Sequence, residues 1–176
     1  NLNGLGSFGS QQIISHAAHG ARSVIGVDLD ADGDGAVASW AELEMQATWY
    51  DNTNGLGTAW VAHDLVPSST QPRGRAIVAA DLDGDADPDL LTAGGWLGDI
   101  SWFENPDGQA GFGQKHSIMT NTKSPRCVHG ADLDGDGDID ALSASFNDDK
   151  IAWSRNLDGL GNFGPQLVIS TTVDGA

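Results

Sequence analysis

Aspartates occupy every second position of residues 132–140, where the sequence reads D-L-D-G-D-G-D-I-D. Carboxylates at positions 1, 3, 5 and 9 of a tight glycine-bearing loop can converge on one point, and that many hard oxygen ligands suit Ca²⁺ better than softer metals. We therefore interpret this run as a calcium loop. Its aspartates are Asp132, Asp134, Asp136, Asp138 and Asp140.

The opening of this loop, D-x-D-x-D-G, is shared with EF-hand loops, but the remainder differs. An EF-hand completes its coordination with a bidentate Glu at position 12. Position 12 here is Ser143, so we assign the closing role to Asp140 at position 9. Residues 141–145 then read as a strand rather than as an exiting helix.

The loop occurs in two further copies, of which one is incomplete. Residues 81–89 keep all five aspartates, namely Asp81, Asp83, Asp85, Asp87 and Asp89. Residues 28–36 keep Asp28, Asp30, Asp32 and Asp34, but Ala36 replaces the ninth-position aspartate. A single Asp/Gly run is more often a solvated turn than a metal site, whereas three runs in one register favour metal binding in the two complete copies. For the first copy both interpretations remain open.

The chain of 176 residues is acidic, with a formal net charge of −17, and the three loops hold 14 of its 25 acidic residues. Much of this charge thus belongs to the expected metal sites and would destabilise the fold without metal. Eight Lys and Arg residues are too few for a phosphate-binding face, which argues against nucleic acid as a partner. No apolar run is long enough to span a membrane.

The single cysteine, Cys127, lies in an apolar run and is predicted to be a buried, inert thiol. The N-terminus shows neither a signal peptide nor an initiating Met, so we expect a mature segment or an excised piece. Weak calcium modules operate in the millimolar calcium found outside cells. We therefore expect an extracellular or cell-surface location.

A repeat of 51 to 53 residues organises the chain, because residues 28–52, 81–105 and 132–156 align without a gap. A Trp recurs three residues before the last Asn of each segment, as Trp49, Trp102 and Trp153. An Arg recurs six residues before each first Asp, as Arg22, Arg75 and Arg126. Because they repeat, we assign the tryptophans to the core between repeats. We assign the arginines to structural contacts with a carboxylate or carbonyl of a neighbouring turn.

Each repeat contains four short runs that have the character of strands. The first run of each repeat is small and apolar, and the third run alternates, with Ile100 and Trp102 on one face. Runs of these kinds lie at 23–27, 76–80, 90–93, 112–119, 127–131, 141–145 and 163–170. Residues 39–46 contain good helix formers, but the alignment makes them a second strand and its turn.

Four strands in a repeat of this length are typical of a β-propeller blade, so the sequence predicts an all-β fold of antiparallel blades. The predicted blades cover 23–66, 76–119 and 127–170, and within residues 1–15 the run 8–15 matches the outer strand of a preceding blade. Propellers close with about four to eight blades. Three blades must therefore be completed by further sequence or by oligomerisation, for example in a homodimer.

Three motifs together resemble the FG-GAP/VCBS repeats of the integrin-α-like propeller family: the D-L-D-G-D-G-D-x-D loop, the I-x-W-x-x-N run and the G-x-G-x-F-G turn. The resemblance implies that a calcium loop joins the first two strands of each blade. Structural Ca²⁺ would be held by the side chains at positions 1, 3, 5 and 9 of the two complete loops. Position 7 would contribute its backbone, with the side chains of Asp34, Asp87 and Asp138 turned to solvent. Ala31 and Ala36 depart from the family's pattern.

A recognition function is expected, because no zinc-type His spacing, nucleophile motif or nucleotide loop occurs. We expect lectin-like or adhesive binding of a glycan or a protein, with Trp96 in the turn at 94–99 as the candidate for ligand contact. One alternative is the propeller scaffold of a polysaccharide-active enzyme of the lyase or dehydratase type, with His63 and Asp64 as the residues to test. A purely structural assembly module is the other.

Overall fold

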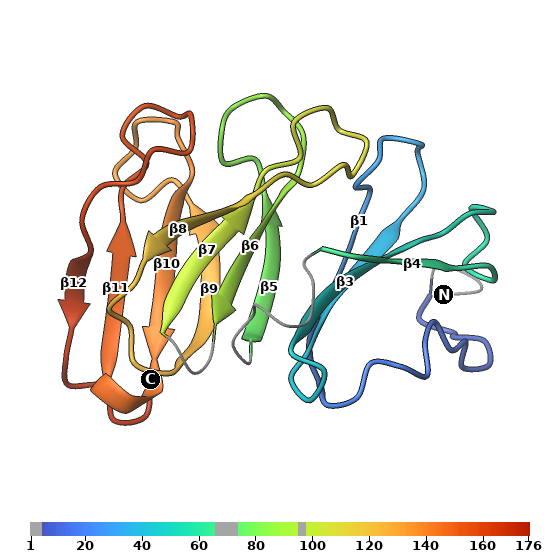
Figure 1. Cartoon of the computed structure of the whole chain (residues 1–176), viewed down its shortest axis with the longest axis horizontal. Coiled ribbons are helices and arrows are strands. Elements are labelled where there is room, and N and C mark those ends of the chain that lie inside the picture. The colour runs from blue at the N-terminus through green and yellow to red at the C-terminus, as the bar shows by residue number, and fades with distance from the viewer. Residues whose placement is uncertain (1–4, 66–73, 95–97) are drawn as a thin grey trace.

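The computed structural model describes residues 5–65, 74–94 and 98–176, which form three four-stranded antiparallel sheets (Figure 1). Sheet 1 contains β1 (Ala21–Val27), β2 (Ala36–Ala41), β3 (Gln46–Asp51) and β4 (Val61–Asp64). Sheet 2 contains β5 (Gly74–Ala80), β6 (Asp89–Gly94), β7 (Asp99–Phe103) and β8 (Lys115–Met119). Sheet 3 contains β9 (Pro125–Ala131), β10 (Asp140–Ser145), β11 (Lys150–Ser154) and β12 (Leu167–Ser170).

The predicted all-β class is therefore confirmed, and the arrangement of the sheets is propeller-like, although the three sheets do not close a ring. In the described part of the chain the one helical element is a short 3-10 turn, η1 (Phe146–Asp148). None of the helical structure described there has the length and apolar character needed to cross a membrane.

Each sheet is a meander, in which neighbouring strands are consecutive in the chain. The first strands β1, β5 and β9 lie side by side, so the sheets stand next to one another like blades (Figure 1). Equivalent residues have equivalent registers, since Trp49 faces Ala38 across β2 and β3 as Trp102 faces Leu91 across β6 and β7. Residues 39–46 accordingly belong to β2, the following turn and the start of β3.

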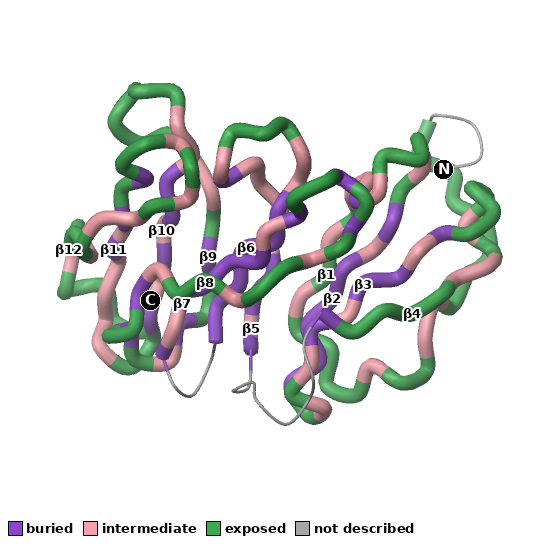
Figure 2. Tube along the Cα trace, turned by 45° about the horizontal axis from the view of Figure 1, so that its top comes forward, coloured by how far each residue is buried: buried purple, intermediate pink, exposed green. Residues whose placement is uncertain are grey.

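Apolar side chains fill both interfaces between the sheets, where Figure 2 shows long buried stretches of the chain. Trp40, Trp49 and Phe103 are buried between sheets 1 and 2, and Trp102 and Val128 between sheets 2 and 3. Burying one large apolar side chain stabilises the fold by about 1.5–3 kcal/mol relative to leaving it exposed. The prediction that Trp49 and Trp102 belong to the core is confirmed.

One face of sheet 3 is covered by none of the described residues. Trp153 is only half-buried on this face, whereas Trp49 and Trp102 are 7% and 4% exposed. Cys127 is exposed on β9, so the prediction of a buried thiol was wrong. Neighbouring residues of a strand point to opposite faces, and in this part of β9 it is Val128 that packs against sheet 2.

The structure also differs from the sequence-based expectation in the outermost strands. Residues 8–15 form no strand. A fourth strand needs a third strand to pair with, and none of the described sheets includes this segment. The fourth strands of sheets 2 and 3 begin at Lys115 and Leu167, later than the runs at 112–119 and 163–170 suggested.

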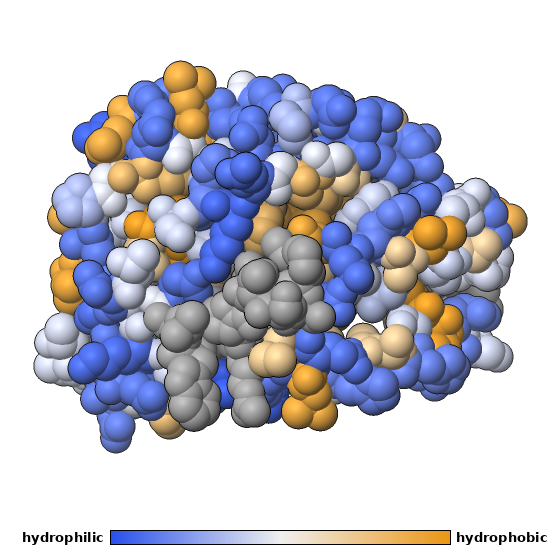
Figure 3. Space-filling view, in the orientation of Figure 1, coloured by the Kyte–Doolittle hydropathy of each residue, from blue (hydrophilic) through white to orange (hydrophobic). Residues whose placement is uncertain are grey.

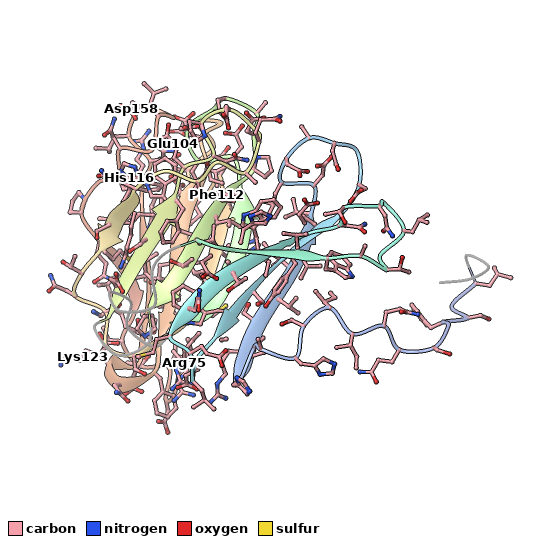
Figure 4. The ribbon with its side chains drawn as sticks, turned by 45° about the vertical axis from the view of Figure 1, so that its right-hand side comes forward. Arg75, Glu104, Phe112, His116, Lys123 and Asp158 are labelled. Carbon is pink, nitrogen blue, oxygen red and sulfur yellow. The ribbon has the colours of Figure 1, made fainter. Side chains whose placement is uncertain are left out.

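The meander topology puts the connections that follow the first and third strands at one end of each sheet, which is the top of Figure 1 for sheets 2 and 3. We call the three acidic connections the first loop (28–36), the second loop (81–89) and the third loop (132–140). Over sheet 2 this end of the molecule is largely hydrophilic (Figure 3). Glu104 and Asp158 lie at the same end, whereas Arg75 and Lys123 lie at the opposite end (Figure 4).

Candidate functional site

Three carboxylates converge in each of the acidic loops. The aspartates at positions 1, 3 and 5 each offer one oxygen, and these oxygens lie within 4.8 Å of one another. The three triplets are Asp28, Asp30 and Asp32; Asp81, Asp83 and Asp85; and Asp132, Asp134 and Asp136. All nine residues are half-buried or exposed, so an ion can reach them from solvent. Hard oxygen donors at this spacing fit Ca²⁺.

The first aspartate of each loop shapes the backbone around this triplet. Asp132 accepts the N–H of Gly135 on Oδ1 at 2.7 Å and that of Gly137 on Oδ2 at 3.0 Å, and the second loop repeats both bonds. Positions 4 and 6 have positive φ, the conformation that favours glycine. Ala31 and Ala86 adopt it as well, with φ of 56° and 75°, so these alanines do not prevent the loop from forming.

The ninth-position aspartates are held by the backbone instead of joining the triplets. Asp89 is fully buried, and it accepts the N–H of Leu82 at 2.8 Å and that of Asn105 at 2.9 Å. Burial raises the pKa of Asp89 to about 7, against the lowering effect of these two hydrogen bonds. Asp140 makes the equivalent bonds in the third loop, and Ala36 removes them from the first. That this position also binds metal stays a prediction.

A buried asparagine ties each of the two complete loops to the preceding sheet. Nδ2 of Asn156 donates to the carbonyl of Leu82 at 2.8 Å and to that of Ile139 at 3.3 Å. Asn105 makes the same pair of bonds one sheet earlier, to Leu29 and its own loop. Sequence reasoning noted these asparagines as landmarks but gave them no role, because their partners are backbone atoms of another repeat.

A cleft of about 400 Å³ lies between the second and third loops. Its lining includes Asp81 and Gly84 from one side and Asp138, Asn156 and Gly159 from the other. Asn156 is fully buried, and its Oδ1 has no hydrogen-bond partner. Both donor positions of Nδ2 are taken by carbonyls, so this side chain braces the wall of the cleft, and the carboxylates of Asp81 and Asp138 are the acceptors that the cleft offers a ligand.

The seventh-position aspartates lie against glycines of the connection between the third and fourth strands. A Cβ added to Gly159 would be 2.5 Å from Oδ1 of Asp138, and one added to Gly108 would be 2.6 Å from Oδ1 of Asp87. From the sequence we expected these side chains to project into solvent, but they are half-buried. Asp138 instead helps to form the cleft.

The charge beside the triplet differs from loop to loop. The residue before the asparagine that ends each aligned segment is Asp51 in sheet 1, Glu104 in sheet 2 and Arg155 in sheet 3. Arg155 donates from Nε to Asp134 at 2.8 Å and from Nη2 to Asp136 at 2.7 Å. The third loop therefore has an internal cationic partner that the equivalent residues of the other two loops cannot provide.

The remaining candidates from the sequence do not add to this site. Trp96 lies outside the described residues. His63 stacks on Trp49 with ring centroids 4.4 Å apart, and Asp64 follows it on β4, so the two side chains point to opposite faces of the strand. This arrangement does not bring an imidazole and a carboxylate together for acid–base chemistry.

Two of the three repeated arginines make the structural contact with a carboxylate that we predicted for all of them. Arg22 and Arg75 both pair with Glu42, a buried residue of the turn between β2 and β3. Arg75 belongs to sheet 2, so this pair links two sheets at the end opposite the acidic loops. Arg126 differs, because its guanidinium lies 4.1 Å from the centroid of the Phe146 ring.

Comparison with known proteins assigns these repeats to a family. The sequence profile of the FG-GAP-like repeat matches residues 28–92 and 81–143, which together make up more than half of the chain. A search of curated proteins found no match. Among solved structures, an Agrocybe aegerita lectin that specifically recognises non-reducing terminal N-acetylglucosamine is similar, with a TM-score of 0.60 and 22% sequence identity. The alignment covers 87% of this chain and 39% of the lectin chain, and at this identity it shows a shared fold.

Proposed function

Because the chain belongs to the FG-GAP-like repeat family, we propose that it is a calcium-stabilised recognition module that binds a glycan at the loop end of its sheets. The observation that carries this proposal is the convergence of the carboxylates at positions 1, 3 and 5 in all three loops. Bound Ca²⁺ would neutralise these carboxylates and hold the loops in shape. We further propose an extracellular setting, where millimolar calcium suits such sites.

Calcium dependence is tested by thermal unfolding of the full chain with calcium and with chelator. We expect a clearly higher Tm with calcium, since an ion that binds the folded chain stabilises it by about 2.7 kcal/mol at 100 times its Kd. The variant Asp81→Ala, which removes the first ligand of a complete loop, should lose part of this increase. An identical Tm in both solutions would show the loops to be ordinary turns.

Glycan binding is proposed for the cleft between the second and third loops. Sugar hydroxyls donate hydrogen bonds, and the cleft offers the acceptors they need in the carboxylates of Asp81 and Asp138. The similarity to a lectin supports a glycan over other ligands. A protein bound through the same loop end is the alternative outcome.

A glycan array that includes glycans with terminal N-acetylglucosamine, probed with the calcium-loaded chain, tests this proposal. Asp138→Ala should weaken binding at least tenfold, because Asp138 lines the cleft. Asp34→Ala is the matched control, since it removes the same loop position in sheet 1, away from this cleft. A blank array, or equal binding by both variants, would contradict the assignment of the cleft.

We also propose that the uncovered face of sheet 3 is covered in the functional molecule by a further sheet of the same repeat. The faces that sheets 1 and 2 turn toward the next sheet are buried by it, and equivalent residues are exposed or half-buried on sheet 3. A second copy of the chain can supply the missing sheet, giving a homodimer. An oligomer of this kind would carry several equivalent clefts.

A further inference from the structure

The three repeats differ in charge at one position that stands directly beside the acidic triplet. In sheets 1 and 2 this position is an acid, Asp51 or Glu104, and in sheet 3 it is Arg155. The three residues occupy the same place in the gapless alignment, immediately before the buried asparagine. The substitution therefore reverses the charge while leaving the surrounding backbone equivalent.

Arg155 engages the oxygens that a metal ion would use. Its Nε and Nη2 lie 2.8 Å and 2.7 Å from Oδ2 of Asp134 and Oδ2 of Asp136, the third and fifth positions of the loop. The guanidinium thus bridges two of the three converging carboxylates. Its side chain is 46% exposed, so the guanidinium can swing away into solvent.

The charges next to the two complete loops have opposite signs. Glu104 adds negative charge beside Asp83, whereas the Arg155 guanidinium contacts Asp134 and Asp136. Without an ion, the second loop therefore contains unrelieved repulsion between carboxylates, whereas the third loop is partly neutralised by its own arginine.

We propose that Arg155 is a built-in counter-ion that competes with calcium at the third loop, so that the second loop fills at lower calcium concentration than the third. This inference rests on the calcium binding proposed above. An ion entering the third loop must displace the guanidinium from two carboxylates, while an ion entering the second loop meets an additional acid, Glu104. The first loop shares the acid but lacks the ninth-position aspartate.

The test is calorimetric titration of the full chain with calcium, comparing the wild type with Arg155→Glu, which copies the charge of Glu104. We expect the third-loop site, identified as the one that Asp132→Ala abolishes, to bind calcium at least tenfold more tightly in this variant. The gain should disappear when Asp132→Ala removes the first ligand of the third loop, and it should persist with Asp81→Ala. Lys123→Glu makes the same change in net charge at the opposite end of the molecule and should leave the site affinities within twofold.

Thermal unfolding separates competition from a merely structural role of Arg155. We expect Arg155→Glu to lower the Tm in chelator, where repulsion in the third loop is no longer relieved, and to restore or exceed the wild-type Tm at saturating calcium. An equal loss of Tm in both solutions, or an unchanged calcium affinity of the third-loop site, would overturn the proposal while leaving calcium binding intact. If the wild type takes up no calcium at all, the proposed calcium function fails together with this inference.

Discussion

Two backbone N–H groups donate to each ninth-position aspartate. In the third loop Asp140 accepts from Leu133 and Asn156 at 3.0 Å and 2.9 Å. Asp140→Ala should therefore destabilise the chain by roughly 1–3 kcal/mol even in chelator, since two amides lose their acceptor and the amide of Asn156 is buried. Urea unfolding measures this loss. Asp85→Ala is the control, because Asp85 is an exposed loop residue, and it should change stability by less than about 0.5 kcal/mol. Equal effects of the two substitutions would show that the hydrogen bonds to Asp140 do not stabilise the chain.

The raised pKa of Asp89 predicts a pH dependence of the metal-free chain. An unfolded Asp has a pKa near 3.9, whereas burial raises the pKa of Asp89 to about 7. Between these values the folded chain binds more protons than the unfolded chain, so this residue's contribution to stability is present at about pH 4 and is lost as the pH rises through about 7. Asp89→Asn mimics the protonated form, so it should flatten the decline.

The measurement is the Tm in chelator at pH 5 and pH 7.5 for both chains. The difference between the two chains isolates Asp89 from the other carboxylates, which shift in both directions. A wild type that loses no more Tm than Asp89→Asn over this range would contradict the prediction. Calcium should reduce the difference, because a nearby cation favours the ionised carboxylate.

At the residue scale, the sequence predicted what depends on spacing alone. Aspartates at positions 1, 3 and 5 converge because a loop with positive φ at positions 4 and 6 turns them inward. The hydrogen bonds of the Asp140 and Asn156 side chains were not predicted, because their partners are backbone atoms. One partner of Asn156 lies in another repeat. The pairing of Arg155 with the third loop was missed because an arginine is no part of the metal-binding pattern.

At the scale of strands and connections, the contact between Trp102 and the connection that follows β11 leaves no room for a side chain at Gly161. Gly161 has φ of +76°, and a Cβ added to it would lie 2.3 Å from the indole of Trp102. Gly161→Ala should destabilise the chain by roughly 2–4 kcal/mol, as backbone strain and overpacking add. Gly57→Ala is the matched control, because Gly57 has the same place in the repeat and φ of +68°, but a Cβ added to it would lie 3.8 Å from the nearest atom, in Trp60, which is an ordinary contact.

Urea unfolding of both variants gives the two contributions separately. The control should lose about 1 kcal/mol, the usual cost of a left-handed backbone for alanine. The extra loss in Gly161→Ala is then the cost of the clash with the tryptophan. Equal losses would mean that the connection moves aside freely, in which case Trp102 would not be locked beneath it.

Strand positions were predictable where both strands of a neighbouring pair belong to the same repeat. The gapless alignment of 25 residues placed β2 correctly in spite of the helix formers at 39–46, because the register of β2 with β3 is the same as that of β6 with β7. Predictions failed where the partner lies outside the described sheets. Residues 8–15 have no third strand to pair with, and Cys127 has no following sheet to cover it.

For the molecule as a whole, three equivalent leucines show that one face of sheet 3 lacks a described partner. Leu29 and Leu82, at position 2 of the first and second loops, are 0% and 1% exposed because the next sheet covers them. Leu133, at the same position of the third loop, is 43% exposed, and Trp153 beside it in the repeat is half-buried. This face therefore has the composition of an interface between sheets but no described partner.

Association through this face is the prediction at this scale. The native mass in millimolar calcium should be near twice the 18.3 kDa of one chain, because two copies supply the sheets that about six blades require. Leu133→Asp should shift the mass to that of a monomer, while Leu157→Asp, at another exposed leucine in the connection between β11 and β12, should not. A wild type that stays monomeric and soluble would contradict closure by a second copy. It would then follow that the covering sheet comes from elsewhere, and ligand binding would have to be measured with that sheet in place.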